Sequence, residues 1–159
     1  MSDSWEAFAQ ALLNESTSLG RLNDSARKLT SALVENSTLE IETAERTLDA
    51  CRIEHQKLVA TRRGMQVRGF GTMSLRDLCA YAPRNMAYQF NQRLAEITYG
   101  TTSLSITNNN NKALILGGMQ RLMNVTSLLQ RSSTENTGTY KRRGFATTPN
   151  ASVLVSSKC

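Results

Sequence analysis

Arginines beside an aromatic ring are the first residues in this sequence whose types and spacing could do chemistry. They fall in segment 62–73, RRGMQVRGFGTM, which also holds glycines at positions 64, 69 and 71. Guanidinium groups neutralise phosphates, an aromatic ring stacks on a base, and glycines let a backbone follow a nucleotide chain. The candidate RNA-binding residues here are Arg62, Arg63, Arg68 and Phe70. A plain loop between helices explains the same segment equally well.

A second segment, nearer the C-terminal end, repeats this mixture of cations and rings. In YKRRGF, residues 140–145, the cations Lys141, Arg142 and Arg143 stand between a tyrosine and a phenylalanine. Contact with RNA and simple exposure to solvent are equally good interpretations of these three residues.

Charge is distributed unevenly along the chain. Residues 1–50 carry four basic and nine acidic side chains, whereas residues 51–159 carry fifteen basic and four acidic ones. Like charges at this density repel one another unless a partner neutralises them. The imbalance favours a polyanionic partner, of which nucleic acid is the commonest. A solvated basic surface is the alternative.

The residue patterns of enzymes and metal sites do not occur in the sequence. The single histidine, His55, falls on the apolar face of a predicted helix, and the three cysteines are widely separated. Neither a glycine-rich phosphate loop nor metal-ligand spacing is found. We therefore predict no enzymatic activity, no cofactor, no metal and no small-molecule substrate. The sequence also predicts no membrane-spanning segment, because no apolar run approaches ~20 residues, and its scattered cysteines favour the reducing cytoplasm.

Three stretches with helical spacing lie in the first part of the chain. The first ends at Gly20, and the second stops at ENST, residues 35–38. The third starts at a capping box formed by Ser37 and Glu40 and runs to about Arg63. Each has one apolar face, which predicts antiparallel helices packed as a bundle.

The segment SLRDLCAYAP combines a helix start with a helix stop. Ser74 caps a short helix, and Asp77 three residues later suits the helix dipole. Pro83 lacks an amide donor and disfavours helical geometry at the residue before it, so the short helix ends or bends there. A new helix then begins at Pro83 and runs to Gly100. Arg76 lies on the polar side of the short helix.

The remaining residues predict one more helix and an arm. Residues 101–111 lose helical spacing and predict a loop, whereas residues 112–130 predict a helix that buries its leucines and methionines. Arg121 on this helix is a further candidate RNA-binding residue, for which exposure to solvent is an equally good interpretation. Residues 131–159 are rich in Ser, Thr and Asn, which is typical of extended or disordered segments. The predicted fold is all-α, with a helical-bundle core over residues 1–130 and an extended, flexible C-terminal arm over residues 131–159.

SLRDLCAYAP resembles a stretch in the coat proteins of flexuous filamentous plant RNA viruses, the potexvirus-like and carlavirus-like families. Those proteins read Thr-Leu-Arg-Gln-Phe-Cys and then Tyr-Ala-Pro. The shared residues are Leu75, Arg76, Cys79, Tyr81, Ala82 and Pro83. The segments KALILGGMQRL and STENT resemble pieces of potyvirus-like coats.

The resemblance implies a helical core that polymerises along single-stranded RNA in a virion assembled in the host cytoplasm. In that family the arginine of the motif lines the RNA pocket, which assigns Arg76 to a phosphate or nucleotide. The family's Phe-Asp-Phe signature is missing here. The end of the chain also resembles rigid-rod, tobamovirus-like coats, which rank second because their Arg-Phe-Pro segment is missing too.

The sequence thus favours a coat protein that packages single-stranded RNA without sequence preference and binds neighbouring copies of itself. The first alternative is a cellular helical-bundle adaptor, whose amphipathic faces bind partner helices and whose basic tail is a docking signal. The second is a helical DNA-binding protein, because residues 84–98 carry several Asn and Gln side chains that could read bases.

Overall fold

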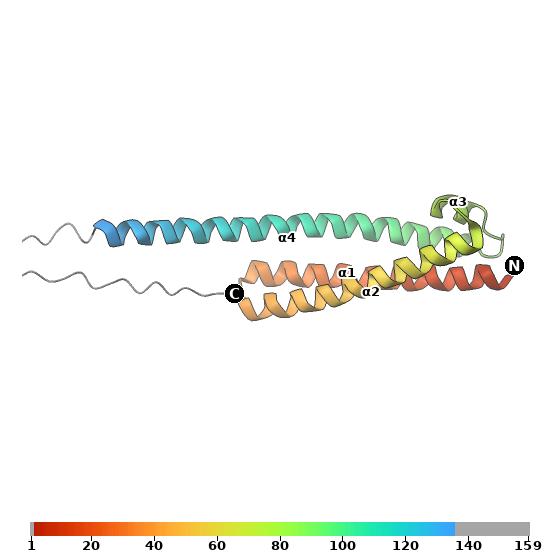
Figure 1. Ribbon diagram of the computed structural model, residues 1–159, viewed down its shortest axis with the longest axis horizontal. Coiled ribbons are helices and arrows are strands. Elements are labelled where there is room, and N and C mark those ends of the chain that lie inside the picture. Colours follow the sequence, from red (N-terminus) through yellow and green to blue (C-terminus); the bar gives the residue numbers. More distant parts are fainter. Residues whose placement is uncertain (1, 136–159) are drawn as a thin grey trace, which may run out of the picture. The chain divides into compact units, whose positions relative to one another are not determined.

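The computed structural model describes residues 2–135, and in this range all regular structure is helical (Figure 1). The elements are α1 (Ser2–Glu35), α2 (Thr38–Phe70), α3 (Leu75–Ala80) and α4 (Ala87–Glu135). The predicted all-α class is confirmed. Residues 136–159, which include Lys141, Arg142, Arg143 and most of the expected arm, lie outside the described residues. The chain divides into two units, Met1–Met119 and Gln120–Cys159, which are described separately.

Helix α1 supplies most of the core of the first unit. Nine of the twelve buried hydrophobic residues in the described range lie on it: Phe8, Ala9, Ala11, Leu12, Leu19, Leu22, Ala26, Leu29 and Ala32. Because they include adjacent positions such as Phe8 with Ala9 and Ala11 with Leu12, they cover more than one face of the helix. One helix can therefore be packed from two sides, by α2 and by the first part of α4.

Polar contacts give the directions of the helices that pack on α1. Arg62 and Glu54 of α2 pair with Glu15 and Arg21 of α1, so α2 runs antiparallel to α1. In α4, Glu96 contacts Ser16 and Asn111 contacts Thr30, so this part of α4 runs parallel to α1. The predicted antiparallel packing is therefore confirmed for α1 and α2, whereas the next long helix returns in the direction of α1.

An aromatic cluster closes one end of this first unit. Phe8 and Phe90 are buried there with Leu12, Leu78 and Cys79, and their rings stack with centroids 5.9 Å apart. Trp5 packs against Phe70, the last residue of α2, at 4.4 Å. Residues from all four helices meet in this cluster, so it fixes α3 and the start of α4 against the α1–α2 hairpin.

The predicted cap of the short helix α3 is confirmed. The Ser74 hydroxyl accepts a hydrogen bond from the Asp77 amide at 3.2 Å and donates one to the Asp77 carboxylate at 2.6 Å. The helix ends at Ala80, before Pro83, as the sequence predicts. Helix α4 begins at Ala87 rather than at Pro83. The Pro83 carbonyl accepts a hydrogen bond from the Ala87 amide at 2.9 Å.

Two expectations about the first helices are wrong. Helix α1 continues through Gly20 to Glu35 instead of ending there. A mid-helix glycine costs only about 1 kcal/mol relative to alanine, and burial of Leu19 and Leu22 on either side outweighs that cost. Ser37 is the N-cap of α2, but its side chain makes no capping hydrogen bond, so the predicted capping box does not form.

The arginine-rich segment predicted as a loop is mostly helical. Helix α2 continues past Arg63 to Phe70 and ends at Gly71, whose φ of 71° lies in the left-handed region. Glycine adopts that conformation without steric cost. The helix persists because Arg62 and Met65 pack toward the core, so the side chains that suggested a loop instead hold the helix in place.

The second predicted loop, residues 101–111, is also helical. Asn111 is buried, and its side chain donates to the Ala26 carbonyl at 3.0 Å and accepts from Thr30 at 2.6 Å. Gly100 lies against α1 so closely that an added Cβ would stand 2.8 Å from Leu19 Cδ2. These contacts with α1 supply the stabilisation that local apolar spacing does not.

In the second unit, the described residues are the end of α4, from Gln120 to Glu135. Residues 131–135, expected to start the arm, are helical. Every side chain from Gln120 to Ser132 is exposed. The prediction that the leucines and methionines of this helix are buried is therefore wrong for this part of α4.

Candidate functional site

The interface between α1 and α2 contains a buried ion pair. Arg62 Nε donates to Glu15 Oε2 at 2.7 Å, and Arg62 Nη1 donates to Gln66 Oε1 at 2.6 Å. Both members of the pair are buried. The guanidinium is thus satisfied inside the fold, and the prediction that Arg62 contacts RNA does not fit this structure. The sequence could not reveal this, because its partner Glu15 is 47 residues away.

The single histidine belongs to the same interface. The Ser18 hydroxyl donates to the Glu15 carbonyl at 2.9 Å and lies 2.8 Å from His55 Nδ1. The hydroxyl and the imidazole ring are hydrogen-bonded, and which of them donates depends on the tautomer of His55. Burial lowers the pKa of His55, and the negative charge of Glu15 partly opposes that shift. The contact joins helices α1 and α2.

The predicted stacking residue Phe70 also serves the core. Its ring is half-buried and contacts both Trp5, at 4.4 Å, and Phe8, at 5.3 Å. Rings in such a cluster contribute to folding through burial and edge contacts. Phe70 is therefore not an open platform for a base.

The other described cations of the predicted set lie at the surface. Arg63 and Arg68 are exposed on the last turns of α2, and Arg76 is exposed on α3. Arg68 folds back over Gly64 on its own helix. Arg121 is exposed in the second unit. Arg63, Arg68 and Arg76 are the predicted RNA-binding residues that the first unit leaves accessible.

A stripe of apolar side chains on α4 is the feature that the sequence analysis missed. Within the second unit, Leu122, Val125 and Leu129 follow one another at steps of three and four, so they share one face. Leu122 is 69% exposed and Leu129 is 65% exposed. Met123 and Leu128 flank them and are exposed as well. We call these five residues the α4 stripe. Its helical spacing was visible in the sequence, but its exposure was not.

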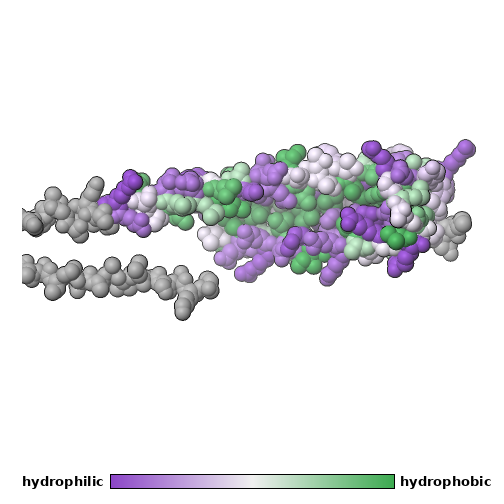
Figure 2. Space-filling view, turned by 45° about the horizontal axis from the view of Figure 1, so that its top comes forward, coloured by the Kyte–Doolittle hydropathy of each residue, from purple (hydrophilic) through white to green (hydrophobic). Residues whose placement is uncertain are grey.

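Hydrophobic side chains do reach the surface of the molecule in several places. Figure 2 shows hydrophobic residues alternating with hydrophilic ones along the helices. Most of the exposed large hydrophobic residues lie on α4. Contiguous exposed apolar surface usually marks a site of association.

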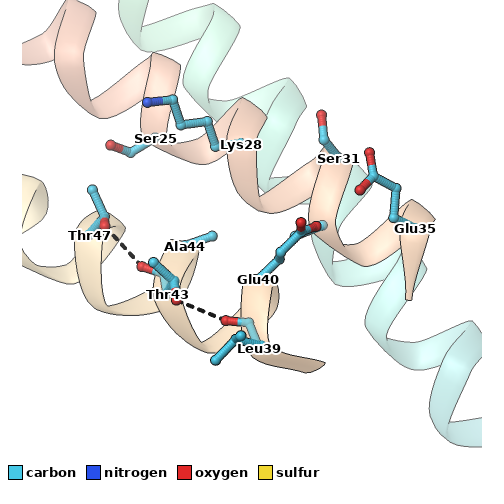
Figure 3. A pocket seen from close by; sticks show the side chains of 10 residues that line it. Ser25, Lys28, Ser31, Glu35, Leu39, Glu40, Thr43, Ala44 and Thr47 are labelled. Atoms are coloured by element: carbon cyan, nitrogen blue, oxygen red, sulfur yellow. Dashed lines mark hydrogen bonds between the residues drawn. The ribbon is translucent and has the colours of Figure 1, made fainter. Parts of the chain in front are cut away.

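A groove between α1 and α2 is the second surface feature. It lies beside the turn that joins the two helices and has a volume of about 580 Å³. Figure 3 shows the side chains that line it. Those from α1 are Ser25, Lys28, Ser31, Ala32 and Glu35, and those from α2 are Leu39, Glu40, Thr43, Ala44 and Thr47.

Among residues 2–135, no three His, Cys, Asp or Glu side chains cluster as metal ligands would. No helix in that range is both long and apolar enough to cross a bilayer. Comparison of the chain with protein families, with curated proteins and with solved structures finds no match.

Proposed function

We propose that the protein is a helical-bundle adaptor that binds an amphipathic helix of another protein along the α4 stripe. The observation that carries this proposal is the exposure of Leu122, Val125 and Leu129 on one face of a helix. Helices of soluble proteins ordinarily turn such a face toward a core. An exposed apolar face that lacks this cover is suited to the helix of a partner.

Two properties of the stripe define its partner. Steps of three and four residues match the side-chain spacing of another helix, which packs its own apolar residues between them. Residues 97–134 contain Lys112, Arg121 and Arg131 but no acidic residue. A partner helix with acidic residues beside its apolar face would be attracted to this segment. Binding of this kind requires no cofactor and no small-molecule substrate.

The stripe supports an adaptor better than the described cations support an RNA groove. Of the RNA-binding residues predicted in segment 62–73, Arg62 is paired inside the fold and Phe70 packs in the aromatic cluster. Arg63 and Arg68 remain exposed.

The test compares a stripe variant with a control on the opposite side of the same helix. Leu122→Gln with Leu129→Gln replaces the leucines at the two ends of the stripe, whereas Asn124→Gln with Ser127→Asn leaves the stripe intact. Proteins captured from an extract of the source cells are identified by quantitative mass spectrometry, and the captured protein is then purified and titrated calorimetrically. We expect the stripe variant to weaken binding at least about tenfold, because a few buried side chains carry most of the binding free energy of an interface. The control should bind like the unmodified protein.

Two outcomes would contradict the adaptor proposal. In the first, the purified partner binds the stripe variant and the unmodified protein equally well. In the second, sedimentation shows that the stripe joins copies of this chain to one another and that no foreign helix competes.

The second outcome would favour the other candidate, a coat protein that polymerises around single-stranded RNA. The observation that favours this function is the exposure of Arg63, Arg68 and Arg76 around the α2–α3 connection. Such cations would contact phosphates without reading bases. Packaging in virions or assembly in a host cytoplasm belongs to this second proposal.

Arg76 provides the specific test of the coat proposal. Arg76→Ala should reduce the RNA content of purified filaments more than Lys158→Ala, as measured by the absorbance ratio at 260 and 280 nm. Equal RNA content in the two variants would remove the role given to Arg76. Negative-stain images that show no filaments with or without added RNA would contradict the coat function itself.

A further inference from the structure

The groove between α1 and α2 is open because small side chains line it. Its lining includes Ser25, Ser31 and Ala32 of α1 and Thr43 and Ala44 of α2. Small side chains do not fill the space between the two helices. Leu39 stands at the end of the groove and is 75% exposed. The groove thus offers an uncovered apolar side chain and room for a further segment.

Two carboxylates give the same groove a negative end. Figure 3 shows Glu35 at the end of α1 and Glu40 on the first turn of α2, and both line the groove. A hydrogen bond that protonated Glu40 donates to Glu35, together with the negative charge of Glu35, raises the pKa of Glu40. Neither carboxylate forms a salt bridge with Lys or Arg within residues 2–135. A cation placed between them would relieve their repulsion.

The surroundings of the groove are acidic as well. Residues 35–49 contain Glu35, Glu40, Glu42, Glu45 and Asp49, against a single basic residue, Arg46. Opposite charge at the other end of the sequence is concentrated in YKRRGF, residues 140–145. This segment pairs three consecutive cations with two aromatic rings, so it matches both the carboxylates and the exposed leucine.

We propose that the α1–α2 groove receives residues 140–145 of a second copy of this chain. Its cations would contact Glu35 and Glu40, and its rings would cover Leu39. Six extended residues span roughly 20 Å, and the ten-residue rise from Ser25 to Glu35 along α1 is about 15 Å. The segment is therefore long enough to span the groove.

The contact is heterologous, because each copy carries one groove and one basic segment. Repetition of a heterologous contact links copies head to tail, and the chain of copies stays open unless its rotation closes a ring. This self-association is independent of the α4 stripe. Leu122→Gln with Leu129→Gln should leave it unchanged.

Complementation between two variants tests the proposal with full-length protein. The groove variant carries Glu35→Gln and Glu40→Gln, and the segment variant carries Lys141→Gln, Arg142→Gln and Arg143→Gln. Sedimentation velocity is measured for each protein and for their equimolar mixture, up to about 100 µM. Glu45→Gln is the matched control, because Glu45 is an exposed acid on α2 that does not line the groove.

We expect the unmodified protein and Glu45→Gln to associate with concentration, and more weakly as salt rises from about 0.1 to 0.5 M. Each variant alone should associate at least about tenfold more weakly. Their mixture retains one intact groove and one intact segment per pair, so it should form heterodimers that grow no further. Circular dichroism should show the same helical content in all proteins.

Three results would overturn the proposal. The unmodified protein could remain monomeric throughout the concentration range. The groove variant could associate as strongly as the unmodified protein. A second groove variant, Leu39→Ser, would then also have to associate as strongly as the unmodified protein. The mixture could also fail to form heterodimers, which would show that a second copy does not fill the groove.

Discussion

Helix α1 and the end of α4 have similar apolar spacing but opposite surroundings. On α1, Leu12 is completely buried and Leu29 nearly so, whereas Leu122 and Leu129 on α4 are largely exposed. Fully burying a leucine contributes about 1.5–3 kcal/mol to folding. Burial of the apolar residues of α1 therefore stabilises the folded chain. The α4 stripe is not buried in the folded chain, so the free energy of burying it remains to stabilise association with a partner.

The largest expected difference between these two stripes is in the free energy of unfolding. Phe8→Ala should lower it by about 4 kcal/mol, because it empties the centre of the aromatic cluster. Leu122→Ala should change it by less than about 0.5 kcal/mol, as exposed substitutions usually do. Urea unfolding followed by circular dichroism measures both. Comparable losses in the two variants would show that the α4 stripe is covered in the folded protein.

The buried ion pair gives the next largest effect. Arg62→Ala should destabilise the protein by about 3 kcal/mol, because Glu15 is left buried and unpaired. Replacing both partners with apolar residues, as Glu15→Leu with Arg62→Met, should recover most of that loss. The control is Arg63→Ala, an exposed neighbour on the same helix, which should have little effect. If urea unfolding shows equally small losses for Arg62→Ala and Arg63→Ala, the buried ion pair of Arg62 with Glu15 does not stabilise the fold.

Two glycines of α4 compare a packed part of this helix with an exposed part of the same helix. Gly100→Ala should cost about 1–2 kcal/mol, because the new Cβ meets Leu19 and the helices must move apart. At Gly118 the added Cβ meets nothing within 4 Å. Gly118→Ala should therefore raise the unfolding free energy, by at most about 1 kcal/mol, through helix propensity alone. Thermal unfolding of the two variants would contradict this contrast if both shifts had the same sign.

The smallest expected effect is the pH dependence from His55. Its pKa is lowered in the folded state, so the unfolded chain takes up a proton first as the pH falls. The histidine should therefore not alter stability well above its unfolded pKa of about 6.5. Below that pH it should lower stability until the folded pKa is passed. Urea midpoints measured from about pH 7.5 to 5 should fall more steeply for the unmodified protein than for His55→Asn, and parallel curves would contradict the prediction.

Local signals predicted some elements correctly for physical reasons that need no long-range partner. The cap formed by Ser74 and Asp77 and the helix stop before Pro83 depend on residues within a few positions of one another. The break at 35–38 is likewise local. The predicted class, all-α, follows from the same short-range spacing.

The wrong predictions concern segments whose helical state depends on distant contacts. Residues 101–111 are polar, but Asn111 bonds to α1 more than eighty residues away. The residues of segment 62–70 are typical of a flexible basic loop, but the segment is helical because Arg62 pairs with Glu15 of α1. In both cases the contacting residues are far apart in the sequence, so local helix propensity cannot predict that these segments are helical.

By itself, the sequence determined which stretches are amphipathic, where two of the turns fall and how charge divides along the chain, because these depend on composition and nearest neighbours. Only the tertiary structure decided which apolar faces are buried and which are open. It also decided that Arg62 and Phe70 serve the core, while Arg63, Arg68 and Arg76 reach solvent. The physical reason is that burial depends on which helix lies opposite a given face, and that pairing is fixed by the packing of the whole bundle.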